Sequence, residues 1–189
     1  MSRGRPRIHH EQTVLDATID VLWREGVRGI SLNQLAKETG IPKPVIANTV
    51  GCKDELIAQA LTHYRERTQN DFNTVLNNAE SLADLMQGYL AVMLERQTLQ
   101  GRPPGCFLSE ANRECARIES GPIREALDRI NHQSQDTLIQ ALTRLGAAAP
   151  EDLARYLSAQ GAAMSSLARN GASRAELEQF VELAARVVD

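Results

Sequence analysis

The sequence predicts an all-α fold, in which a small N-terminal group of helices is joined by one long helix to a larger helical unit. Apolar residues recur at three- and four-residue spacing along most of the chain, whereas the alternation typical of strands is almost absent. Aromatic residues make up only 4% of the 189 residues. A chain of this length can bury a sizeable core as one or two domains.

The segment 31–53, SLNQLAKETGIPKPVIANTVGCK, is expected to form two short helices separated by a tight turn. The apolar face of the first helix consists of Leu32, Leu35 and Ala36. Ser31 is a favourable N-cap, because its hydroxyl can accept a hydrogen bond from a free backbone N–H. Gly40 suits the turn, where the backbone adopts a left-handed conformation that only glycine tolerates cheaply.

The second helix is expected to start beside Pro42, a residue that fits only at the edge of a helix. Its inward side chains are expected to be Val45, Ile46 and Val50, and its outward ones Lys43, Asn48 and Thr49. Two short helices joined by a glycine-containing turn are typical of a helix-turn-helix, whose second helix enters the major groove of DNA. The alternative interpretation is an ordinary helical hairpin.

The N-terminus, MSRGRPRIHH, is basic and contains no acidic residue. Gly4 and Pro6 disfavour a helix there, so we expect a flexible cationic arm that follows phosphates or enters a narrow minor groove. The alternative is a solvated tail without a partner. An amphipathic helix over 10–25 follows and ends at Gly26, which completes a three-helix DNA-binding layout.

The N-terminal part of the chain resembles the TetR family of bacterial repressors. The matching pieces are GRPR, VLWREGVRGISLNQLAKETGIPKP and GCKDEL. The resemblance implies that Ser31 opens the positioning helix, that 43–49 is the recognition helix and that Lys53 contacts a backbone phosphate. The DNA-binding residues expected on this basis are Arg5, Arg7, Ser31, Lys43, Pro44, Val45, Asn48, Thr49 and Lys53.

Two positions depart from the family pattern. Ala47 stands where the family usually has an aromatic residue, mostly tyrosine, and Val50 stands where it has phenylalanine. The phosphate contact of a tyrosine hydroxyl is therefore absent, and Asn48 and Thr49 are the candidates to replace it.

The chain beyond Cys52 is expected to form a second, larger helical domain for ligand binding and dimerisation, so the predicted domains are 1–52 and 53–189. This domain begins with one long helix over 53–78. The other expected helices cover roughly 82–99, 106–118, 121–146, 150–170 and 173–188. The clearest break between helices is the sequence GRPPG at 101–105.

The last two expected helices are rich in small residues, which allow helix backbones to approach closely. The segment 160–177 also resembles a TetR subgroup in which these helices form the dimer. The expected interface residues are Leu157, Ala162, Ala163, Ser166, Leu177 and Phe180. A two-fold operator also requires a dimer, and the alternative is that these helices only close the core of one protomer.

Sulfur-containing and aromatic residues of the second domain are candidates to line a ligand cavity, although core packing explains them equally well. They are Met86, Tyr89, Met93, Cys106, Phe107 and Met164. Cys106 follows Gly105 at an expected helix N-terminus, where the helix dipole can lower the pKa of a thiol. Cys106 is therefore either a sensor of oxidants or electrophiles, or an inert core cysteine.

Other kinds of site find little support in the sequence. No pattern of a catalytic triad, paired carboxylates or phosphate loop occurs, so we expect no catalytic residue and no cofactor. Adjacent residues of His9-His10-Glu11 point apart on a helix, so we expect no metal site. The three cysteines lack a disulfide framework, and neither a signal peptide nor a membrane-spanning stretch is present, which predicts a cytoplasmic protein.

These observations together predict a homodimeric transcriptional regulator, most simply a repressor. It would bind a palindromic double-stranded operator and be released by an unidentified small molecule. The first alternative is release through modification of Cys106. The alternatives of another class are a Cys106-dependent enzyme and a helical interaction module that does not bind DNA.

Overall fold

The computed structural model describes residues 7–186, with side chains described from residue 11 onwards. Within these residues the chain consists of helices and their connections, with no strand, so the all-α prediction is confirmed. The helices are α1 (Arg7–Glu25), α2 (Leu32–Thr39), α3 (Lys43–Val50), α4 (Lys53–Asn78), α5 (Leu82–Gln97), α6 (Phe107–Glu114), α7 (Pro122–Arg144), α8 (Pro150–Arg169) and α9 (Arg174–Ala185).

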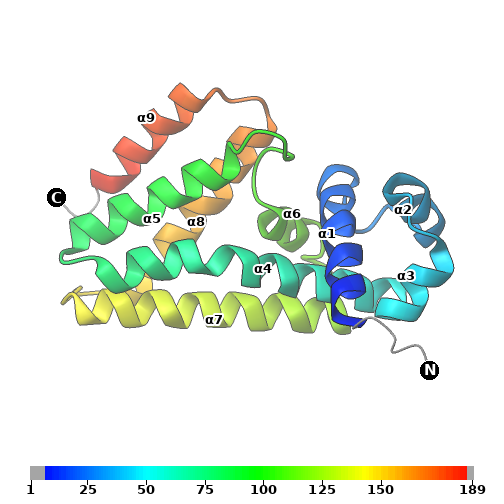
Figure 1. The fold of residues 1–189 in the computed structure, drawn as a ribbon. Coiled ribbons are helices and arrows are strands. Elements are labelled where there is room, and N and C mark those ends of the chain that lie inside the picture. Colours follow the sequence, from blue (N-terminus) through cyan, green and yellow to red (C-terminus); the bar gives the residue numbers. More distant parts are fainter. Residues whose placement is uncertain (1–6, 187–189) are drawn as a thin grey trace.

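Helices α4 and α7 run side by side in the same direction along the length of the molecule (Figure 1). At the end where both helices start, α1, α2 and α3 form the head. At the other end, α5, α8 and α9 cover the pair, while the short α6 lies between this body and the head. The long α4 therefore belongs to both parts and joins them, as the sequence predicted.

The first helix of the helix-turn-helix is capped as expected. The Ser31 hydroxyl accepts a 3.2 Å hydrogen bond from the backbone N–H of Gln34, whose side-chain oxygen accepts one of 2.9 Å from the Ser31 N–H. Gly40 ends the helix with a φ of 68°, the left-handed conformation that the turn requires. These local contacts fix where α2 starts and where the chain turns.

Helix α3 differs from the prediction at one position. Ile46 and Val50 are buried at 0% and 3% exposure, but Val45 is 38% exposed, so the expectation that all three pack inward is wrong for Val45. An eight-residue helix buries only the side that contacts its neighbours, and Val45 lies beyond that side. Val45 is consequently part of the open face of α3.

Two helices of the body are shorter than predicted. Helix α6 was expected over 106–118 but covers Phe107–Glu114, because the chain passes into a turn in which the Ile118 N–H donates to the Cys115 carbonyl. Helix α5 ends at Gln97 rather than near residue 99. None of the described helices is long and apolar enough to cross a membrane.

The apolar core has two clusters, and the first of them extends beyond the head. Trp23 of α1, Tyr64 of α4 and Phe107 of α6 pack together, with ring centroids 5.4 to 6.2 Å apart. The start of α7 also belongs to this cluster. The second cluster fills the body between α4, α5, α7, α8 and α9. The division of the chain at residue 52 remains a prediction.

Candidate DNA-binding head, effector cavity and dimer face

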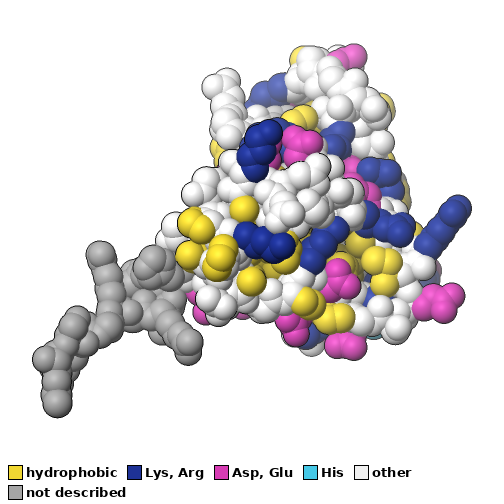
Figure 2. Space-filling view, turned by 90° about the vertical axis from the view of Figure 1, so that its right-hand side faces the viewer, with side chains coloured by type: hydrophobic (Ala, Val, Ile, Leu, Met, Phe, Trp, Pro, Cys, Tyr) yellow, Lys and Arg dark blue, Asp and Glu magenta, His cyan; other side chains and the backbone are white. Residues whose placement is uncertain are grey.

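The expected DNA contacts of α3 lie on its open side. Lys43, Pro44, Val45 and Asn48 are exposed and Thr49 is half-buried. Figure 2 faces the end of the molecule that carries the head, where basic, acidic and apolar side chains are interspersed. A helix with one buried side and one open side can enter a DNA groove without losing its packing.

Ser31 and Lys53 lie at the starts of α2 and α4. Ser31 is exposed, and Lys53 is half-buried with its Nζ donating a 2.9 Å hydrogen bond to the Arg28 carbonyl. The Lys53 ammonium is thereby held beside the turn that leads into α2. Of the two arginines expected in the arm, Arg5 lies outside the described residues, and Arg7 begins α1 with a side chain that is not described.

The head is attached to the body by polar contacts that the sequence did not predict. The Glu114 carboxylate at the end of α6 accepts hydrogen bonds from the backbone N–H groups of Val27, at 2.9 Å, and Arg28, at 3.3 Å. Arg169 of α8 donates to the Trp23 carbonyl at 3.2 Å. Contacts so distant in sequence leave no local pattern by which they could have been recognised.

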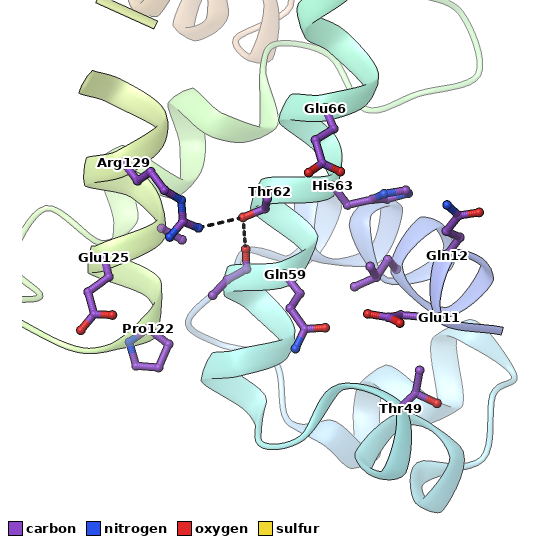
Figure 3. A pocket seen from close by; sticks show the side chains of 13 residues that line it. Glu11, Gln12, Thr49, Gln59, Thr62, His63, Glu66, Pro122, Glu125 and Arg129 are labelled. Carbon is purple, nitrogen blue, oxygen red and sulfur yellow. Dashed lines mark hydrogen bonds between the residues drawn. The ribbon is translucent and has the colours of Figure 1, made fainter. Parts of the chain in front are cut away.

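A polar groove separates the head from the start of α7 (Figure 3). It has a volume of about 660 Å³ and is lined from α1, the end of α3, α4 and α7. Arg129 of α7 crosses it to donate a 3.3 Å hydrogen bond to the Thr62 hydroxyl of α4. On the α1 side, Asp16 accepts from His63 at 2.8 Å and also pairs with Arg67. The Asp16 contacts fix α1 of the head relative to α4, and the Arg129 contact joins α7 to α4.

A cavity of about 480 Å³ lies in the body between α4, α5, α6, α7 and α8. Its lining comprises Tyr64, Arg65, Thr68, Phe72, Tyr89, Met93, Arg96, Gln97, Cys106, Leu108, Ser109, Asn112, Asn131, Ser134, Gln135, Ser158, Gly161 and Ala162. A cavity of this volume, with aromatic and polar walls, has the usual character of a small-molecule site.

Only part of the expected ligand set lines this cavity. Tyr89, Met93 and Cys106 do, and burial raises the pKa of Tyr89 to about 12, so its hydroxyl is protonated. The prediction that Met86, Phe107 and Met164 line the cavity is wrong, because each of these side chains is 0% exposed and fills the core. The polar wall of the cavity was not predicted, because helix periodicity does not reveal which polar side chains face inward.

Some of the residues expected at the dimer interface lie at the surface of the protomer, and others do not. Ala162, Ala163 and Ser166 are exposed on α8, and Phe180 of α9 is half-buried. Leu157 and Leu177, however, are 0% exposed inside the same protomer, so neither can contact a partner and both predictions need correction. Two leucines that were not predicted as contacts, Leu167 and Leu183, are exposed at 41% and 64% on α8 and α9.

The three cysteines occupy different environments and are all free thiols. Cys52 is exposed at the start of α4, Cys106 is half-buried in the cavity wall, and Cys115 is buried. Burial raises the pKa of the Cys115 thiol, which keeps it protonated and unreactive. Among the residues from 11 to 186, no group of three His, Cys, Asp or Glu side chains could hold a metal ion.

Comparisons with known proteins agree with this architecture. No family model matches the chain. The chain is 28% identical to the HTH-type transcriptional repressor ComR of Escherichia coli strain K12, over 95% of this chain and 89% of that protein. Its fold matches the TetR family transcriptional regulator CifR, solved as a cysteine mutant with a 26-bp operator DNA, with a TM-score of 0.82, 24% identity and complete coverage of both chains.

A second solved structure gives the same result at lower identity. The reduced form of NemR from E. coli has a TM-score of 0.78 and 20% identity, over 95% of this chain and 96% of that one. These similarities cover head and body together, including the short α6 between them. The resemblance to the TetR family is thereby confirmed, and the chain has the fold of the TetR-family transcriptional regulators from its helix-turn-helix to its last described helix.

Proposed function

We propose that the protein is a DNA-binding transcriptional regulator that acts as a repressor on a palindromic operator. The observation that carries this proposal is the helix-turn-helix itself: a capped α2, a left-handed Gly40 and an α3 whose outer face is open. The similarity to ComR, which is named as a transcriptional repressor, supports the direction of regulation. In this role Lys43, Asn48 and Thr49 face the base edges, while Ser31 and Lys53 hold phosphates.

We propose a homodimer as the active form. Two heads related by a two-fold axis would place their α3 helices in successive major grooves, about 34–36 Å apart. The exposed small residues of α8 and the exposed Leu167 and Leu183 supply an apolar face that a second copy can cover.

We place the protein in the cytoplasm, where operator DNA is available and thiols stay reduced.

The cavity is the proposed effector site. Tyr64 and Arg65 of α4 line it, and the same helix starts at Lys53 in the head. An effector that binds better to one arrangement of α4 shifts the population of dimers towards that arrangement. When the favoured head spacing no longer fits two successive grooves, the operator is released.

A mobility-shift assay on the DNA upstream of the protein's own coding sequence tests this function. The wild-type protein should shift this fragment at concentrations that leave a scrambled fragment free. Lys43→Ala combined with Asn48→Ala should abolish the preference without lowering thermal stability, because both side chains are exposed. Equal binding of wild type and double variant to both fragments would reject α3 as the reader and favour a helical module of another function.

A second candidate mode of release is modification of Cys106. It is favoured by one observation: among the three thiols, only Cys106 lines the cavity. An electrophile such as N-ethylmaleimide forms an S–C bond when the thiol adds across its double bond, and the thiol's proton ends on the neighbouring carbon. The adduct would fill the cavity much as an effector would.

The Cys106→Ser variant distinguishes the two modes of release. Release of operator DNA by N-ethylmaleimide from the wild type but not from Cys106→Ser supports thiol sensing. Equal release from both proteins assigns Cys106 to the cavity wall only. We assign no catalytic role to this thiol. Consumption of more than one equivalent of electrophile per protomer would instead indicate an enzyme.

A further inference from the structure

The charged side chains in the cavity wall are all positive. Its described lining contains two arginines, Arg65 and Arg96, and no aspartate or glutamate. Arg96 is neutralised by an ion pair with Asp71. The side chain of Arg65 has neither an ion pair nor a hydrogen bond to any residue that the structure describes. The cavity therefore carries one positive charge that the protein leaves without a partner.

This arrangement is costly for the empty protein. Arg65 is half-buried, and desolvation lowers the pKa of its guanidinium, which shows that the surroundings disfavour the charged form. Its neighbours include the Tyr89 hydroxyl and the Cys106 thiol, both neutral groups when protonated. An anion within the cavity would remove this cost, because a charge-assisted pair with a guanidinium is strong where water is scarce.

One hydrogen-bond acceptor in the wall, the side-chain oxygen of Gln97, also lacks a partner. Gln97 is 5% exposed, and its Nε2 donates a 3.2 Å hydrogen bond to the Gly161 carbonyl. This contact fixes the orientation of the amide, since a carbonyl can pair only with the NH₂ side. The Gln97 Oε1 is buried and has no hydrogen-bond partner. A buried acceptor left unpaired lowers stability, so a donor on a ligand would be bound favourably there.

The remaining wall contains apolar side chains and two asparagines that already bond to each other. The rings of Phe72 and Tyr89 lie with centroids 5.0 Å apart, and Met93 also lines the cavity. Asn112 of α6 and Asn131 of α7 also line the cavity and bond to each other at 2.8 and 3.3 Å. A ligand therefore finds an aromatic surface for a flat body, while the two asparagines are satisfied without it.

We propose that the effector is an organic anion with a flat, apolar body and one hydrogen-bond donor. Its anionic group pairs with Arg65, its body packs on Phe72, Tyr89 and Met93, and its donor reaches Gln97 Oε1. This inference rests on the proposed function of the cavity as an effector site and adds the chemical class of the effector.

The test uses two dyes of nearly equal shape. Anilinonaphthalene sulfonate has a flat aromatic body, one N–H and one sulfonate, whereas N-phenylnaphthylamine has the same body and N–H without the charge. Fluorescence titration of the full-length protein should show tighter binding of the sulfonate by about tenfold or more, which corresponds to about 1.4 kcal/mol. Equal or tighter binding of the neutral dye overturns the inference.

Variants locate the binding to the cavity. Arg65→Gln should lower affinity for the sulfonate about tenfold and leave the neutral dye unaffected, whereas Arg65→Lys should retain most of the preference. Gln97→Leu should weaken both dyes, because both carry the N–H. The matched control is Arg67→Gln on the same helix, whose side chain pairs with Asp16 outside the cavity. Unchanged sulfonate affinity in a folded Arg65→Gln protein overturns the inference.

The dye titrations need no DNA, so they separate this inference from the proposed function. A protein that selects the sulfonate through Arg65 but binds no operator would refute the regulator and retain the anion site. A protein that binds its operator but does not distinguish the two dyes would refute the anion site alone. Thermal melting of each variant, compared with wild type, shows whether a lost affinity reflects lost folding.

Discussion

The Glu114 carboxylate accepts a 2.9 Å hydrogen bond from the backbone N–H of Val27, a residue 87 positions earlier in the chain. The carboxylate stands at the last residue of α6, and the N–H belongs to the turn between α1 and α2. Gly26 precedes that turn with a φ of 89°, and a Cβ built on it would lie 2.9 Å from the Glu114 side chain. The turn and the carboxylate are therefore fitted to each other closely.

Glu114→Ala should destabilise the protein by about 1–3 kcal/mol, because the partly buried N–H of Val27 would lose its acceptor. Glu114→Gln should cost less, since its amide oxygen can still accept. Urea unfolding measures the change in free energy, and Glu119→Ala, an exposed residue beyond α6, is the control. An alanine variant as stable as the control would show that water replaces Glu114 at this turn.

Lys53→Ala should weaken binding to the operator and to random DNA alike, because a phosphate contact carries no sequence information. The slope of log affinity against log salt should become shallower by about 1. Fluorescence anisotropy over a salt series measures both quantities. Arg155→Ala on α8, which removes one exposed positive charge away from the head, should leave the slope unchanged. A loss restricted to the operator would instead assign Lys53 to base reading.

Asn48→Ala should relax the preference at one base position in each half-site and cost about 1–3 kcal/mol of operator binding. The reason is that an asparagine side chain can pair with adenine through two hydrogen bonds. Selection of binding sites from a randomised pool, followed by sequencing, reads the preference position by position. Asn77→Ala, at the far end of α4, supplies the comparison, and identical profiles for both variants would exclude Asn48 from the reading set.

Ala163→Arg should shift the protein from dimer to monomer and abolish tight operator binding in the same step. A large charged side chain on the exposed small-residue face of α8 would hold the helices of two copies apart and bury a charge without a partner. Sedimentation gives the mass of the variant. The control is Ala148→Arg in the loop before α8, and an Ala163→Arg protein that remains dimeric with its operator bound would place the interface elsewhere.

The fold was predictable where local rules decide it. Ser31, Gly40 and Pro42 set the limits of the helix-turn-helix through capping and backbone preference alone, and the long α4 follows from unbroken helix periodicity. Each of these signals lies within a few residues of the structure that it specifies. The same is true of the N-cap at Ser173, whose hydroxyl accepts from the Glu176 N–H.

The candidate sites were predictable only in part, because they depend on which helices meet. Periodicity places Leu157 and Leu177 on apolar faces but does not say whether another helix of the same chain or a second copy covers them. The same limit applies to the core residue Met164. The contributions of Arg65 and Gln97 to the cavity become apparent only when α4, α5 and α8 are brought together.

The contact of Trp23 with Tyr64 and Phe107 has a consequence for exchanging parts between relatives. A chimaera joined at residue 52 would receive one ring of the three from the donor and two from the recipient, so the join would cut through a packed cluster. Exchange of DNA specificity is therefore simplest by grafting the outer face of α3, which leaves every ring in place. In this architecture the proposed reading surface on α3 could be exchanged by itself, whereas the helices that support it belong to both parts of the molecule.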